Sequence, residues 1–98
     1  QRSLRAGLNF KVVLSPAAER DLDALTEDTA RSVGAALGVL ADNPFPRGKL
    51  VKKMKGSRAA FYRLRVDKHR AFYEIDGATV VVLRVIARKD VEKYLKRR

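Results

Sequence analysis

Residues 60–86 have the sequence AFYRLRVDKHRAFYEIDGATVVVLRVI, and this stretch carries the strongest signal for the fold. At its start the hydropathy period becomes two, and the apolar residues that alternate with arginine are Tyr62, Leu64 and Val66. Such alternation predicts a half-buried strand. A turn at residues 67–68 leads into a second strand, and Asp76-Gly77 is a strong hairpin signal before the β-branched segment 79–86. The stretch therefore predicts three antiparallel strands in a β-meander.

The residues before the meander predict one strand and a pair of helices. Residues 10–14, FKVVL, are rich in residues that favour strands. Ser15-Pro16 then starts a helix, because serine caps a helix N-terminus and proline is tolerated in the first turn. Thr26 is a second cap, and Asn43-Pro44 ends the helix that follows it. After the meander, residues 90–98 predict a short polar helix.

The expected fold is a single α+β domain over residues 1–98, with the element order β-α-α-β-β-β-α. A chain of 98 residues is an ordinary length for one domain. Residues 1–8 precede the first predicted strand, and we expect them to be flexible. The basic segment 49–56, KLVKKMKG, shows no clear period. We expect its Leu50 and Met54 to turn inward while its later lysines face water.

The composition excludes several classes of site. The chain has no cysteine, which excludes a disulfide scaffold, thiolate metal sites and a cysteine nucleophile. It has one histidine, His69, and no glycine-rich phosphate loop, so we expect neither a metal nor a cofactor. No apolar run approaches the roughly 20 residues of a membrane helix, and residues 1–8 lack the apolar core of a secretion signal. These features favour a cytoplasmic protein.

The positive charge is concentrated in one half of the chain. The formal net charge is +11. Residues 1–46 hold 5 basic and 6 acidic side chains, whereas residues 47–98 hold 17 basic and 5 acidic ones. Such an excess points to a polyanionic partner, and nucleic acid is the leading candidate. The alternatives are solubility, or a surface that an acidic protein covers.

Arginines at strand spacing are the candidate binding residues. Arg63 and Arg65 are two residues apart and share a face, and Arg70 lies across the predicted turn from them. Arg88 lies at the end of the long strand. Guanidinium groups bind phosphate through paired hydrogen bonds, and aromatic side chains stack on unpaired bases. The aromatic candidates beside the arginines are Phe72 and Tyr94.

Each candidate also has a structural interpretation. The arginines would then form a solvated face that Glu74 and Asp76 balance, Tyr94 would pack against the sheet, and His69 would be a polar turn residue. The lysines at positions 52, 53 and 55 would form a solvated loop, with attraction to phosphate as the alternative. Spacing alone supports the structural and the phosphate-binding interpretations of the arginines equally.

The segment Lys52–Ile75 resembles the core motif of the RelE/ParE superfamily of toxins. The family's K-L-x-G segment is matched by residues 53–56, KMKG. Its aromatic-R-x-R strand is matched by residues 62–66, YRLRV, and its R-x-x-Y-x-I strand by residues 70–75, RAFYEI. The opening FKVVLSPAAERDLDAL and the tail VVVLRVIARKDVEKYL also resemble the family, so the likeness spans nearly the whole chain.

This resemblance implies a RelE-like fold and a toxin of a toxin–antitoxin system. RelE-type members cut mRNA in the ribosomal A site. ParE-type members poison DNA gyrase instead. For this chain we expect metal-free cleavage through attack of the ribose 2′-OH, which would inhibit translation. The implied partners are a cognate antitoxin, mRNA and the ribosome, with operator DNA bound through the antitoxin complex and no membrane partner. A degenerate toxin that retains antitoxin binding and operon repression is a further alternative.

The family's functional residues match positions in this chain. The resemblance implies catalytic roles for Arg63, Arg65, Arg70, Arg88 and Tyr94, and we expect RNA contacts from Lys52, Lys53, Lys55, Phe72 and Lys89. Tyr94 follows Arg88 by six residues, the spacing of RelE proper, which favours the ribonuclease branch. Two departures are Ala87, where many members have histidine, and the first two arginines, where RelE proper has lysines. Arginine does not release its proton, so these arginines would act as clamps, and the general base is not identified.

Overall fold

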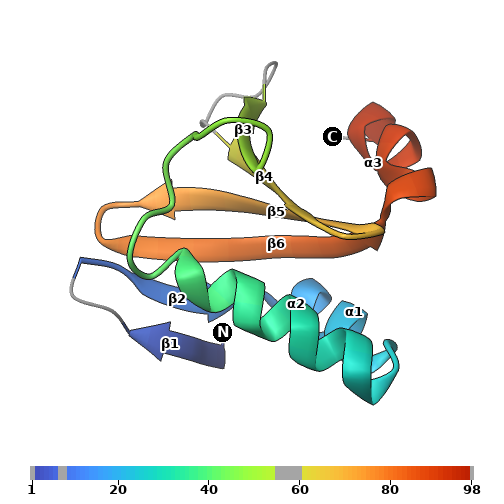
Figure 1. Cartoon of the computed structure of the whole chain (residues 1–98), viewed down its shortest axis with the longest axis horizontal. Coiled ribbons are helices and arrows are strands. Elements are labelled where there is room, and N and C mark those ends of the chain that lie inside the picture. The colour runs from blue at the N-terminus through green and yellow to red at the C-terminus, as the bar shows by residue number, and fades with distance from the viewer. Residues whose placement is uncertain (1, 7–8, 55–60, 98) are drawn as a thin grey trace.

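The computed structural model describes the backbone of residues 2–6 and all of residues 9–54 and 61–97 (Figure 1). A six-stranded sheet has the strand order β1-β2-β6-β5-β4-β3, in which β2 and β6 are parallel and the other pairs are antiparallel. The elements in chain order are β1 (Arg2–Ala6), β2 (Lys11–Leu14), α1 (Pro16–Asp23), α2 (Glu27–Val39), β3 (Val51–Met54), β4 (Phe61–Val66), β5 (His69–Asp76), β6 (Thr79–Ala87), the 3₁₀ helix η1 (Arg88–Asp90) and α3 (Val91–Arg97).

The α+β class, the helical hairpin and the meander are confirmed. Ser15 caps α1, because its Oγ accepts the backbone N–H of Ala18 at 3.1 Å. Thr26 caps α2 in the same way, through the backbone N–H of Thr29 at 3.3 Å. Helix α2 ends at Val39, which is several residues before the predicted stop. The final helix follows the long strand as expected.

Two strands were not predicted. Residues 2–6, which were expected to be flexible, form β1 and pair with β2. The segment expected to lack regular structure contains β3, so the meander has four strands. The prediction that Leu50 turns inward is wrong, because Val51 is buried opposite Leu64 and its neighbour must then face outward. Leu50 is accordingly exposed, whereas Met54 packs beside a buried cluster as expected.

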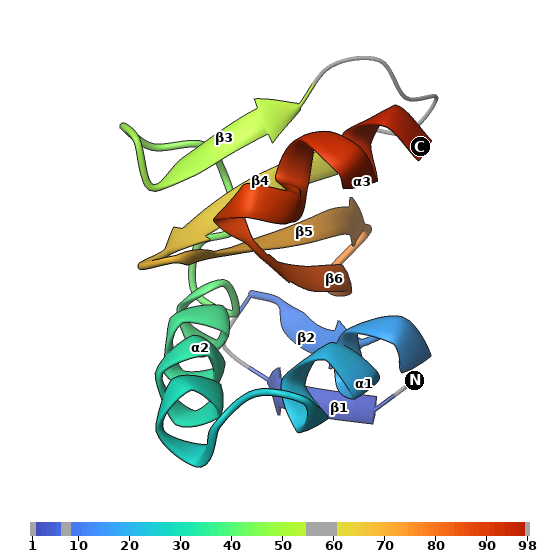
Figure 2. The ribbon, with the colours of Figure 1, turned by 90° about the vertical axis from the view of Figure 1, so that its right-hand side faces the viewer.

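Helices cover both faces of the sheet. The larger core lies under α1 and α2, and its biggest buried side chains include Leu14, Leu37 and Tyr73. On the opposite face, α3 lies against β4, β5 and β6 over a second cluster of Phe61, Phe72 and Ile86 (Figure 2). The second face is therefore divided between this apolar cluster and the basic side chains that continue along the same strands. Within the described residues, none of the helices has the length and apolar composition needed to cross a membrane.

Candidate functional site

A pocket lined by cations lies on the α3 face of the sheet, beyond the part that α3 covers. Its volume is about 520 Å³, and we call it the basic pocket. The lining residues are Gly48, Lys49, Lys52, Arg63, Arg65, Arg70 and Arg88. Six of these seven are cationic, and no carboxylate lies among them. An arrangement of this kind attracts an anion and repels a metal ion.

The register of the sheet brings these side chains together. Arg65 is directly opposite Arg70 on the neighbouring strand, and Lys52 is directly opposite Arg63. Residues directly opposite in antiparallel strands project from the same face, about 5 Å apart. Arg88 joins them at the end of β6, where its backbone N–H donates to the carbonyl oxygen of Lys68 at 2.8 Å. Four separate segments of the chain thus contribute to one pocket.

Arg70 forms the buried floor of the pocket. Among the described residues, it is the only charged or polar one that is buried, with 7% of its surface exposed. Its Nη1 donates to the carbonyl oxygens of Asp67 and His69, both at 2.8 Å. Burial, followed by the charges of the three neighbouring pocket arginines, lowers the pKa of Arg70, although the nearby Asp67 opposes this. Arginine nevertheless stays protonated, so the group is a fixed positive charge held in place by backbone carbonyls.

Arg63 links the pocket wall to the loop before β3. Its Nη2 donates to the carbonyl oxygen of Lys49 at 3.0 Å, which holds the loop beside the strand. Its buried Nε has no hydrogen-bond partner in the structure. Gly48 has a φ of 52°, a left-handed conformation that glycine adopts without strain, and it turns the chain so that Lys49 reaches the pocket. Gly48 and Lys49 were not among the predicted site residues, although a glycine flanked by basic residues is a turn signal.

The predicted aromatic residues do not line the pocket. Phe72 is fully buried, with its ring centroid 6.2 Å from that of Phe61 and 5.0 Å from that of Tyr94. The prediction that Phe72 stacks on RNA bases is therefore corrected, because α3 covers its ring. Tyr94 is half-buried on Phe72 and lies outside the pocket lining. Tyr94 therefore packs against the sheet, as its structural interpretation predicted.

The predicted lysines are separated by strand geometry. Lys52 lines the pocket, but Lys53 lies opposite Tyr62 and so belongs to the other face of β3. Lys89 is exposed in η1 and is not a lining residue. Lys55 lies outside the described residues. The basic pocket thus unites five of the ten sequence candidates, namely Lys52, Arg63, Arg65, Arg70 and Arg88.

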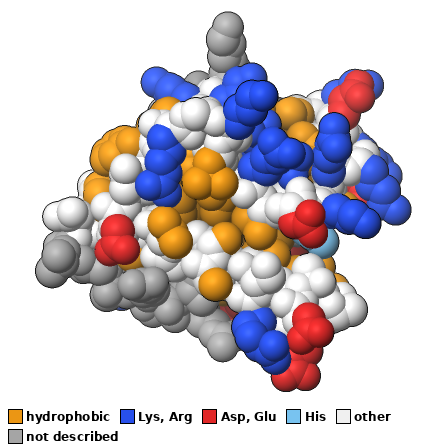
Figure 3. All heavy atoms as spheres, viewed as in Figure 1, with side chains coloured by type: hydrophobic (Ala, Val, Ile, Leu, Met, Phe, Trp, Pro, Cys, Tyr) orange, Lys and Arg blue, Asp and Glu red, His pale blue; other side chains and the backbone are white. Residues whose placement is uncertain are grey.

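The two carboxylates proposed to balance the arginines lie elsewhere. Glu74 is opposite Phe61, and Asp76 is exposed beside the hairpin opposite Thr79. Neither lines the basic pocket. On the surface, lysine and arginine side chains gather over the part of the molecule that contains β3, the β4–β5 turn and α3 (Figure 3). The geometry therefore favours the anion-binding interpretation over the balanced-face interpretation.

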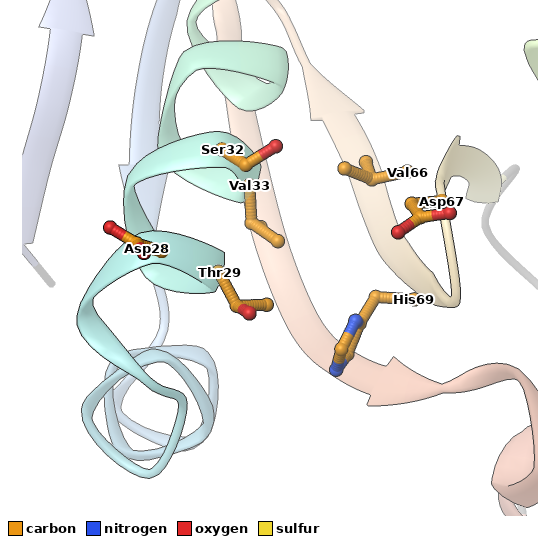
Figure 4. Close-up of a pocket in the computed structure, with 7 residues that line it drawn as sticks. All are labelled: Asp28, Thr29, Ser32, Val33, Val66, Asp67 and His69. Atoms are coloured by element: carbon orange, nitrogen blue, oxygen red, sulfur yellow. The ribbon is translucent and has the colours of Figure 1, made fainter.

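A smaller pocket lies on the other face, between α2 and the β4–β5 turn (Figure 4). Its volume is about 170 Å³, and His69 lies in it with residues of α2. Asp28, on its rim, already accepts a hydrogen bond from Arg31 at 3.1 Å. The described residues contain no group of three or more His, Asp or Glu that could hold a metal ion. His69 is thus a polar residue at the turn, away from the cation cluster.

Comparison with known families agrees with this fold. A family model described as the ParE toxin of type II toxin–antitoxin system, parDE, matches residues 12–92. The chain belongs to the ParE toxin family. This confirms the resemblance to the RelE/ParE superfamily. No curated protein sequence gives a significant match.

Solved structures of RelE toxins share the fold of this ParE family member. The toxin–antitoxin complex RelBE2 from Mycobacterium tuberculosis is 29% identical, with a TM-score of 0.69, and the match covers 82% of this chain and 99% of that one. The archaeal RelE–RelB complex from Pyrococcus horikoshii OT3 is 22% identical, with a TM-score of 0.70, covering 83% and 97%. The RelB–RelE complex from Methanococcus jannaschii is 24% identical, with a TM-score of 0.65, covering 83% and 95%.

Proposed function

We propose that this ParE family member is a ribosome-dependent endoribonuclease that cleaves mRNA and inhibits translation until an antitoxin binds it. The observation that carries the proposal is the basic pocket, in which six cations converge and no carboxylate is present among the lining residues. A phosphodiester is the anion that such a pocket fits, because fixed guanidinium groups bind phosphate oxygens through paired hydrogen bonds.

The reaction breaks the bond between phosphorus and the 5′ oxygen. The ribose 2′ oxygen attacks the adjacent phosphorus and gives its proton to water, and the leaving 5′ oxygen takes a proton from water. The products are a 2′,3′-cyclic phosphate and a free 5′-OH. Negative charge grows on the phosphoryl oxygens in the transition state, where preorganised donors have their largest effect. The chain's own residues supply those donors.

Each arginine has a role that follows from its position. Arg63 and Arg65 project side by side from β4 and hold the phosphate. Arg70, fixed by two backbone carbonyls, places positive charge beneath it. Arg88, exposed at the rim, hydrogen-bonds the leaving oxygen. The lining residues include neither a carboxylate nor a histidine to act as general base, so orientation of the RNA by the ribosome supplies much of the rate.

The remaining candidates act at the edges of this site. Tyr94 contacts a base or the 2′-OH from its place on α3. Lys52 attracts the phosphate chain from within the pocket, while Lys53, Lys55 and Lys89 contribute long-range attraction. Six pocket cations take the place of a metal ion in neutralising the transition state.

An antitoxin would inhibit the enzyme by covering the same residues. RelE in two of the similar solved structures is bound to RelB, and we propose that this chain also binds a cognate antitoxin. The helical hairpin packs on the sheet, whereas the basic pocket and α3 are accessible. An acidic antitoxin segment would therefore occupy the pocket or displace α3, in the cytoplasm where mRNA is translated. Operator DNA would be bound through the antitoxin complex.

Primer extension on translated mRNA after induction tests this function. Codon-phased cuts that disappear on coexpression of the antitoxin would support it. The family model is that of a ParE toxin, and the competing function implied by the resemblance to ParE-type members is poisoning of DNA gyrase. Intact mRNA together with trapped gyrase–DNA complexes would overturn the ribonuclease proposal and establish that alternative. Intact mRNA without trapped complexes would indicate a degenerate toxin.

A further inference from the structure

An ion pair connects α1, near the start of the chain, with β6, near its end. Asp21 Oδ2 accepts from Arg84 Nε at 2.7 Å, and its Oδ1 accepts from Arg84 Nη2 at 3.1 Å. The two side chains are 16% and 38% exposed, so the pair is partly shielded from water. A two-pronged contact of this kind fixes the plane of the guanidinium group, which a single contact would not.

The sheet itself holds Asp21 in place. Strand β2 ends at Leu14, opposite Val82, so beyond this point β6 has no strand on that side. The pairing of β5 with β6 also has a register shift here: Phe72 pairs with Arg84, whereas Tyr73 pairs with Val82. Helix α1 completes the edge, since the Oγ of its capping serine donates to Leu83 O at 2.9 Å and Asp21 Oδ2 accepts from Val85 N at 2.8 Å. The carboxylate is thus a substitute for a missing strand partner.

The other side of the Arg84 guanidinium faces α3. Its Cζ lies 5.8 Å from the centroid of the Tyr94 ring, within cation–π range. The same ring lies on Phe72, with a centroid separation of 5.0 Å. Helix α3 has no fully buried residue, and it rests on the sheet through half-buried side chains. Tyr94 is therefore held between a clamped cation and a buried aromatic ring.

One row of residues connects this clamp to the basic pocket. Arg84 is opposite Phe72, Phe72 is opposite Arg63, and Arg63 is opposite Lys52. Residues paired in this way lie on the same face of the sheet. Tyr94 stands on the first two members of the row, and the last two line the pocket. The Tyr94 ring thus lies next to the half of the row that lines the pocket.

We propose that Arg84, oriented by Asp21, is a positioning residue that holds Tyr94 and α3 at the edge of the basic pocket. The role of Tyr94 toward RNA rests on the proposed function, whereas the clamp itself does not. The competing explanation is an ion pair that stabilises the fold and has no effect on Tyr94.

A spectroscopic experiment tests the clamp without RNA. The chain has three tyrosines, so 3-fluorotyrosine labelling gives three ¹⁹F resonances, with the buried Tyr62 and Tyr73 as internal references. Arg84→Lys and Asp21→Asn are expected to move the Tyr94 resonance toward that of an exposed tyrosine and to accelerate amide exchange in α3 about tenfold. Asp23→Asn is the matched control, because it removes the same charge from an exposed position on the same helix.

A double-mutant cycle then tests the functional part. Arg84→Lys is expected to slow mRNA cleavage about tenfold in the parent and to have no further effect in a Tyr94→Ala background, because it acts through that ring. An equal effect in both backgrounds, or an unchanged ¹⁹F resonance in correctly folded Arg84→Lys, would overturn the inference. A parent that cleaves no mRNA, together with altered ¹⁹F and exchange signals in Arg84→Lys and Asp21→Asn, would support the clamp and reject the proposed ribonuclease activity.

Discussion

Replacing Arg88 with alanine is expected to remove most of the cleavage activity while leaving the fold intact. The side chain is exposed at the rim of the basic pocket, and the hydrogen bond to Lys68 O comes from the Arg88 backbone, which alanine retains. Truncation of an exposed side chain changes the free energy of unfolding by less than about 0.5 kcal/mol. The loss also removes one of the positive charges that lower the pKa of Arg70, so any change in stability is expected to be upward.

The effect on catalysis should be much larger than the effect on binding. Five of the six pocket cations remain in Arg88→Ala, so attraction of the phosphate chain is largely kept. Removal of one preorganised donor to a developing negative charge typically slows a reaction by about 10²–10³-fold. We therefore expect a loss of this size in the single-turnover cleavage rate on programmed ribosomes, together with a modest change in ribosome affinity.

The measurement compares cleavage by primer extension with unfolding in urea for the parent and two variants. Arg20→Ala is the matched control, because it removes the same charge from an exposed position on α1, which covers the opposite face of the sheet. It should cleave like the parent. If Arg88→Ala also cleaves at the parental rate, Arg88 is not part of the site. A large loss of stability in Arg88→Ala would show that its role is structural.

Three further outcomes are expected. Tyr73 donates to Pro44 O at 2.6 Å and burial raises its pKa, so its contribution to stability is complete below the ordinary tyrosine pKa of about 10 and falls at higher pH by up to about 1.4 kcal/mol per unit. Urea titrations should show a shallower alkaline decline in Tyr73→Phe, and an equal slope would contradict this. Ser15→Ala loses the α1 cap and should lower the free energy of unfolding by about 1 kcal/mol in the same assay. The affinity for single-stranded RNA should fall steeply with salt, and Arg65→Gln should reduce the slope of log K against log[salt] by about 0.7 if that arginine neutralises one phosphate. A flat salt response would point to a protein target.

Much of the architecture was predictable because its signals are local. The serine and threonine caps, the hairpin at Asp76-Gly77 and the alternation along β4 depend on residues within a few positions of one another. The same alternation was sufficient to place Arg63 and Arg65 on one face, and the turn between β4 and β5 placed Arg70 opposite Arg65. The sequence alone therefore determined the fold class, the family and the core of the basic pocket.

Which faces and edges of the sheet are covered depends on contacts between elements that are distant in sequence. Neither β1 nor β3 has a strong local pattern, and each forms a strand because a neighbouring strand offers free backbone hydrogen-bonding groups. The sequence predicts that Phe72 stacks on bases beside the arginines, but α3 packs over its ring. Asp21 and Arg84 are 63 residues apart, and no local pattern predicts their pairing. Periodicity reports which side a residue faces, but what lies on that side depends on elements distant in sequence, and only the packed chain brings these together.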